Sequence, residues 1–116
     1  MMNKRFWFIS VMMFFGPMFL FHGKLTKAHA DLADQIAKAD VGYGEYLSGE
    51  CVTCHRSTGA SEGIPAINGI DAEIFVSIIN AYRSKELENK VMQMMAGRLD
   101  DEQIISLAAY FSSLPD

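Results

Sequence analysis

The chain has 116 residues, half of them hydrophobic, and a formal net charge of −4 at pH 7. This length predicts one domain. Four of the ten basic residues precede the first acid, Asp31, so the remainder of the chain holds six basic residues against fourteen acids, a formal charge of −8. Such an acidic surface argues against nucleic acid as a partner, because binding to nucleic acid needs basic contacts to phosphate.

The N-terminal segment 1–30 has the pattern of an export signal. A basic pair at 4–5 is followed by the charge-free apolar run 6–21, and Ala28-His29-Ala30 is a small-x-small cleavage pattern. We therefore predict a signal peptide and an exported, periplasmic domain at 31–116. A retained membrane anchor and a buried helix of the domain are the alternatives, although the apolar run is shorter than the roughly 20 residues that span a bilayer.

The first predicted helix of the domain runs from Asp31 to about Ser48, where apolar residues recur at helical spacing. Gly42 and Gly44 lower the helix propensity within it by about 1 kcal/mol each relative to alanine. They predict either the close approach of another helix or a bend between two short helices.

Two further helices are predicted from their capping residues. Asp71 is a good N-cap for a helix that ends near Arg83. Asp100 and Gln103 form a capping box at the start of the last helix, which ends before Pro115.

The connections between these helices differ in composition. The stretch 57–69 is rich in Gly, Ser and Pro and predicts a loop, whereas 84–99 contains three closely spaced methionines. Nothing in the chain alternates convincingly between apolar and polar residues as a strand would. The predicted fold class is therefore all-α.

The sequence Cys51-Val52-Thr53-Cys54-His55 is C-x-x-C-H, the attachment pattern of c-type haem. Two thiols at this spacing can each reach one vinyl group of the porphyrin, and the next residue places an imidazole under the iron. A redox dithiol is an alternative, but its usual βαβ setting is missing, and a structural zinc site needs four ligands. We favour one covalently bound haem c, attached through Cys51 and Cys54 with His55 as iron ligand.

The second axial ligand must be another residue type, because His55 is the only histidine after residue 30. Met92, Met94 and Met95 are the only methionines after residue 18. Methionine paired with histidine raises the reduction potential of haem iron. Each methionine could instead fill the core, so the residues alone leave open which one binds the metal.

Over essentially all of 44–114 the sequence resembles class I c-type cytochromes. The resemblance is closest to short bacterial monohaem forms, such as cytochrome c4 domains and the haem subunit of flavocytochrome c sulfide dehydrogenase. Besides C-x-x-C-H, residues 91–104 are similar to the family pattern M-x-x-[IM]-A-x-x-L-[ST]-D-x-[DE]-I. The resemblance implies Met92 as the iron ligand and Met95 as a packing residue.

The same resemblance implies two further arrangements. In the loop 63–69, the carbonyl of Pro65 would accept a hydrogen bond from the imidazole of His55 and orient it. The first and last helices would cross around the haem, with Gly44 and Leu47 packed against Tyr110 and Phe111.

These observations predict a periplasmic monohaem cytochrome that passes single electrons by outer-sphere transfer between redox partner proteins and has no catalytic residues. A haem-bearing subunit of a dehydrogenase, paired with a flavoprotein, is the main alternative. An enzyme or gas sensor with an open iron site is the third. Contact with a membrane is expected only if the N-terminal segment is retained.

Overall fold

The computed structural model describes residues 22–56 and 63–115. It divides into two units, Met1–Ala30 and Asp31–Asp116, and the second contains the C-x-x-C-H motif. The basic start and apolar run of the predicted signal peptide lie outside the described residues, so that peptide and its cleavage site stay predictions. Within the described ranges, no helix has both the length and the apolarity needed to cross a membrane.

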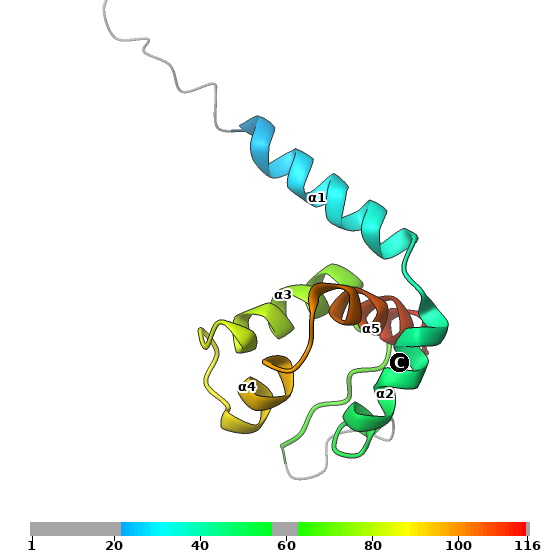
Figure 1. Cartoon of the computed structure of the whole chain (residues 1–116), viewed down its shortest axis with the longest axis vertical. Coiled ribbons are helices and arrows are strands. Elements are labelled where there is room, and N and C mark those ends of the chain that lie inside the picture. Colours follow the sequence, from blue (N-terminus) through cyan, green and yellow to red (C-terminus); the bar gives the residue numbers. More distant parts are fainter. Residues whose placement is uncertain (1–21, 57–62, 116) are drawn as a thin grey trace, which may run out of the picture. The chain divides into compact units, whose positions relative to one another are not determined.

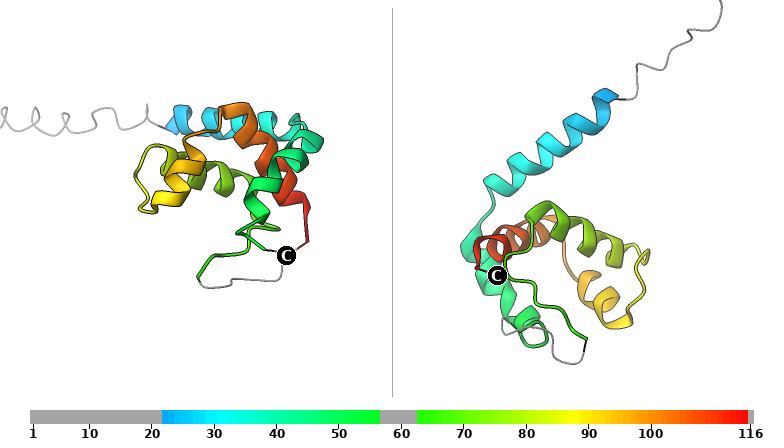
Figure 2. Two further views of the ribbon diagram at one scale, coloured as in Figure 1. Left: turned by 60° about the horizontal axis from the view of Figure 1, so that its bottom comes forward. Right: turned by 180° about the vertical axis from the view of Figure 1, so that it is seen from behind.

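All regular structure in the described residues is helical, which confirms the predicted all-α class. Helix α2 packs against α5, α5 packs against α3, and α3 packs against α4. Figures 1 and 2 show this arrangement from three sides, with the segment 63–70 running up to the C-terminal end of α5. The helices are α1 (His22–Ala37), α2 (Val41–Val52), α3 (Ala72–Arg83), α4 (Lys90–Ala96) and α5 (Asp101–Ser113).

Helices α2 and α5 cross at Gly44, which is buried. A Cβ atom added at this glycine would lie 2.0 Å from the carbonyl oxygen of Ser106 and 2.9 Å from Cβ of Tyr110. Ser48, one turn further along α2, is also buried, and its hydroxyl donates to the carbonyl of Glu45. Small residues on α2 thus allow the two backbones to touch, which is the close approach that the glycines predicted.

The apolar core lies between α3 and α5. Its largest fully buried apolar side chains are Ile104, Leu107 and Phe111 of α5. Phe75 of α3 stacks on Phe111 with 5.7 Å between ring centroids. The core is small, as expected for a domain of this length, which favours an additional stabilising element such as a bound cofactor.

The first predicted helix is divided in the structure, and the division does not fall at its glycines. Helix α1 ends at Ala37 and α2 begins at Val41, because Asp40 is extended and its side chain accepts a hydrogen bond from the backbone N–H of Tyr43. An N-cap residue has non-helical backbone angles, so the preceding helix cannot continue through Asp40. Gly42 and Gly44 lie inside α2, and only Gly44 is closely packed against another helix.

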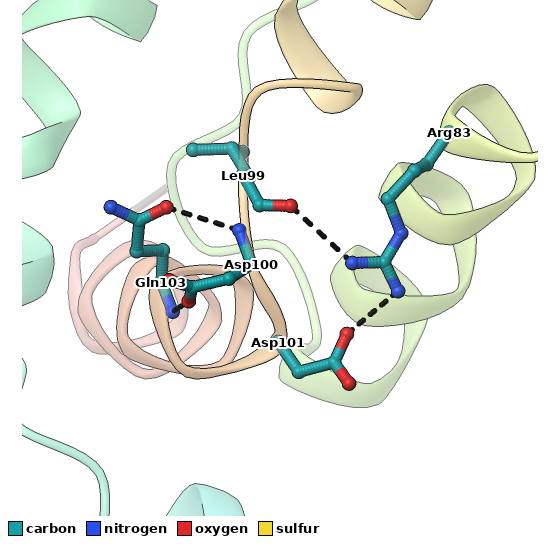
Figure 3. A network of polar contacts seen from close by, with 5 residues as sticks. All are labelled: Arg83, Leu99, Asp100, Asp101 and Gln103. Carbon is teal, nitrogen blue, oxygen red and sulfur yellow. Dashed lines mark hydrogen bonds and ion pairs between the residues drawn. The ribbon is translucent and has the colours of Figure 1, made fainter.

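The predicted helix starts at Asp71 and Asp100 are confirmed. The carboxylate of Asp71 accepts from the N–H of Ile74, and Asp100 forms a complete capping box with Gln103. Figure 3 shows this capping box beside a second set of contacts, in which Arg83 donates to the carbonyl of Leu99 and pairs with Asp101. These contacts join the end of α3 to the start of α5.

Helix α4 was not predicted from the sequence. Asn89 caps it, its side chain accepting from the N–H of Met92 at 3.0 Å, and the side chain of Gln93 donates to the carbonyl of Leu87. The helix has only seven residues and its first turn holds no acid. The one signal that could have located it is Asn89, a preferred N-cap residue, directly before the methionine-rich stretch.

Helix α3 ends in a Schellman-type turn with an unusual residue at its left-handed position. The N–H of Glu86 donates to the carbonyl of Ala81 and that of Lys85 to the carbonyl of Tyr82. Lys85 has a φ of 66°, a conformation that glycine adopts without steric cost and other residues adopt at roughly 1–2 kcal/mol.

We expect Lys85→Gly to stabilise the protein by about 1 kcal/mol, since it removes this strain. Lys85→Ala is the matched control, because it removes the same side chain but keeps a Cβ, and it should change stability by less than about 0.5 kcal/mol. Urea unfolding of the haem-loaded protein followed by circular dichroism measures both. Equal stabilities for the two variants would contradict the assignment of strain.

Candidate haem site

The C-x-x-C-H motif lies where α2 ends. Cys51 is in the last turn of the helix, and its carbonyl accepts the N–H groups of Cys54 and His55 at 3.2 and 2.9 Å. The hydroxyl of Thr53 donates to the carbonyl of Gly49 one turn back. The helix end and this turn therefore fold the five residues into one compact unit, in which both thiols and the imidazole belong to a single piece of backbone.

The two cysteines are not bonded to each other and differ in environment. Cys54 is exposed, whereas Cys51 is half-buried and packs against the apolar core. Burial, reinforced by the negative charge of Glu50, raises the pKa of the Cys51 thiol. These two causes favour the neutral thiol of Cys51 over its thiolate. A free thiol is the form from which a thioether to a vinyl group can be made.

The imidazole of His55 is oriented by the segment 63–70. Its Nδ1 lies 2.7 Å from the carbonyl oxygen of Pro65. Since a carbonyl can only accept, Nδ1 carries the hydrogen and Nε2 has the free lone pair that a metal needs. The loop itself is anchored to the last helix, because the N–H of Gly69 donates to the carbonyl of Phe111 at 2.9 Å. Helix α5 thus holds the segment 63–70 in place, and this segment in turn orients the imidazole of His55.

The three methionines of α4 lie in different environments. Met94 is 59% exposed, whereas Met92 and Met95 are half-buried. Of the two half-buried residues, Met92 packs against the core cluster, as Cys51 does. The backbone of Met92 is also held by the Asn89 cap. Met92 is the methionine whose position the surrounding structure determines best.

These donors fit a haem. The site offers two free thiols, one imidazole with its Nδ1 already engaged, and one half-buried thioether. Cys51 and Met92 are 41 positions apart in the sequence and border the same apolar cluster. Thiols suit the porphyrin vinyl groups, and imidazole and thioether are a known axial pair for haem iron.

A family model agrees with this donor set. The model described as Cytochrome c matches residues 39–115, which is most of the chain. The chain belongs to the cytochrome c family. As a member of that family it is a haem-based electron carrier with covalently bound haem c, and the crossing of α2 and α5 is the crossing of terminal helices expected for this fold.

Two curated relatives agree with the family. The chain is 37% identical over 81 residues to cytochrome c-554(548) of Halomonas halodenitrificans, covering 64% of this chain and 95% of that protein. It is 31% identical over 104 residues to the thiosulfate dehydrogenase electron acceptor of Stutzerimonas stutzeri, covering 81% of this chain and 48% of the relative. This cytochrome therefore spans about half the length of the second protein and nearly all of the first.

The structure also contains one charged contact beside the C-x-x-C-H motif that the sequence did not indicate. Arg98, in the turn before α5, lies 3.9 Å from the carboxylate of Glu50, the residue before Cys51. The two residues are 48 positions apart, and neither stands at a defined position of the motifs described above. No local signal could have paired them.

Proposed function

We propose that this protein is a periplasmic electron carrier whose single haem is attached through Cys51 and Cys54 and ligated axially by His55 and Met92. The observation that carries the proposal is the 2.7 Å contact between Nδ1 of His55 and the carbonyl of Pro65. It leaves Nε2 as the ligating atom, restricts rotation of the ring, and increases its basicity, as hydrogen bonds to ligating histidines generally do.

Met92 completes the site. The Asn89 cap holds its backbone and the core cluster holds its side chain, so the thioether is preorganised. When bound, haem supplies a one-electron ferric/ferrous couple, and a thioether ligand shifts that couple to higher potential. The chain's own residues then hold both ligands in place in the two oxidation states, and outer-sphere transfer requires no further group from the protein.

The partner is proposed to be a redox protein. From Asp31 onward the chain carries a formal charge of −8, which favours a partner with a basic or neutral docking surface. One relative is an electron acceptor of thiosulfate dehydrogenase, which supports a dehydrogenase as electron donor. Export to the periplasm is supported by the signal-like residues 1–30.

A second candidate is a permanent haem subunit of a dehydrogenase, including one with a flavoprotein partner. The similarity to a protein named for its dehydrogenase favours this possibility as well. Affinity purification of the chain from its native host separates the two functions. A flavoprotein that stays bound through gel filtration would identify a subunit, and a free monomer would identify a shuttle.

The ligand assignment predicts that Met92→Leu abolishes the weak far-red absorption band of the methionine–iron bond and lowers the reduction potential, because leucine cannot coordinate. The matched control is Met94→Leu on the same helix, whose side chain is exposed and should leave both properties unchanged. Absorption spectra of the oxidised and reduced proteins, made with a cytochrome c maturation system, measure both variants.

Haem retained on a denaturing gel by all three proteins establishes covalent attachment independently of the axial ligand. If Met92→Leu keeps the far-red band and Met94→Leu loses it, Met94 is the ligand. If both variants keep it, the ligand is Met95 and the assignment from the surrounding structure is wrong.

A further inference from the structure

One charged pair lies beside the haem attachment motif without belonging to it. Glu50 directly precedes Cys51 in the last turn of α2, and Nη1 of Arg98 lies 3.9 Å from its Oε2. The pair joins the end of α2 to the turn between α4 and α5. The backbones of α2 and α4 do not approach each other closely in the described residues, so this pair links two segments that are otherwise apart.

The charge of Glu50 acts at the sulfur of Cys51. Burial is the main cause of the raised pKa of that thiol, and the negative charge of Glu50 is the second cause. A Coulomb interaction depends on distance and medium and not on which group carries the charge. The carboxylate of Glu50 opposes negative charge on the sulfur of Cys51. It should therefore also oppose the reduction of a haem bonded to that sulfur, because reduction adds an electron.

The ion pair is loose. A separation of 3.9 Å is longer than a hydrogen bond, and the two side chains are 69% and 66% exposed. An exposed pair of this kind contributes little to stability. Because the guanidinium does not contact the carboxylate closely, it offsets the negative charge only in part.

We propose that Glu50 and Arg98 tune the reduction potential of this cytochrome in opposite directions, the carboxylate lowering it and the guanidinium raising it. The inference rests on the proposed attachment of haem at Cys51. Ferric haem carries one more positive charge than ferrous haem, so a nearby anion favours the ferric form and a nearby cation favours the ferrous form. Both residues act through their charge, and neither ligates the iron.

The test is a spectroelectrochemical titration of the haem-loaded full chain at low ionic strength. Glu50→Gln should raise the ratio of reduced to oxidised protein at a fixed potential by roughly twofold to fivefold, and Arg98→Gln should lower it by a similar factor. In the double variant, the ratio of reduced to oxidised protein should be closer to that of the wild type than in either single variant. Raising the salt concentration should shrink all of these shifts.

Glu45→Gln is the matched control, because it removes the same charge from an exposed position on the same helix. Its shift should be clearly smaller than that of Glu50→Gln. If the two shifts are equal, or if Arg98→Gln raises the ratio, the inference is overturned while the proposed function stands. If the wild type shows no reversible one-electron couple at all, the proposed function fails first.

Discussion

Gly44→Ala is expected to destabilise the protein by roughly 3 kcal/mol or more, the largest effect of any added methyl group in α2. The new Cβ would lie 2.0 Å from the carbonyl oxygen of Ser106 and 2.6 Å from its carbonyl carbon. Both are backbone atoms in the middle of α5, so the contact cannot be relieved by rotating a side chain. The two helices would have to separate, and the apolar contacts that α5 makes with α3 would be strained as well.

Gly49→Ala is the matched control, since it lies on the same helix and a Cβ there would meet nothing within 4 Å. It should be neutral or stabilise the protein by up to about 1 kcal/mol, because alanine favours a helix more than glycine does. Guanidinium unfolding of the two haem-loaded variants gives both values. A Gly44→Ala midpoint that matches that of Gly49→Ala would show that α2 and α5 do not cross at this residue.

The second large effect concerns the cysteines. Changing both Cys51 and Cys54 to serine should abolish haem staining on a denaturing gel, because a hydroxyl of nearly the same size cannot form the thioethers. We also expect most of the helical circular dichroism to be lost. The domain has a small core, and a cofactor that binds only the folded state contributes directly to its stability.

Thr53→Ala is the control for this experiment. It alters the same turn and removes the hydrogen bond to the carbonyl of Gly49, but it keeps both thiols. It should retain haem on the gel at the level of the wild type. Haem staining that persists in the double serine variant would contradict attachment at this motif, since the chain contains no other cysteine.

Local sequence determined several elements of the fold correctly. The starts of α3 and α5 were predicted because a capping aspartate and its partner lie three residues apart and interact wherever the rest of the chain goes. The C-x-x-C-H motif is local in the same sense, because its thiols and imidazole belong to one turn at the end of α2. The division at Asp40 and the short helix α4 also have capping signals, but these compete with stronger apolar patterns nearby.

The tertiary structure alone decided which distant residues meet. That a glycine in α2 would touch another helix could be expected, but its contact with the backbone of Ser106 depends on the angle at which the helices cross. The pairing of Arg98 with Glu50 likewise requires α2 and the turn before α5 to be brought together by the core. Sequence by itself determined the chemistry available to this cytochrome, because residue types and local spacing carry it. The positions of the charged side chains near the haem attachment motif depend on long-range packing, which no local pattern encodes.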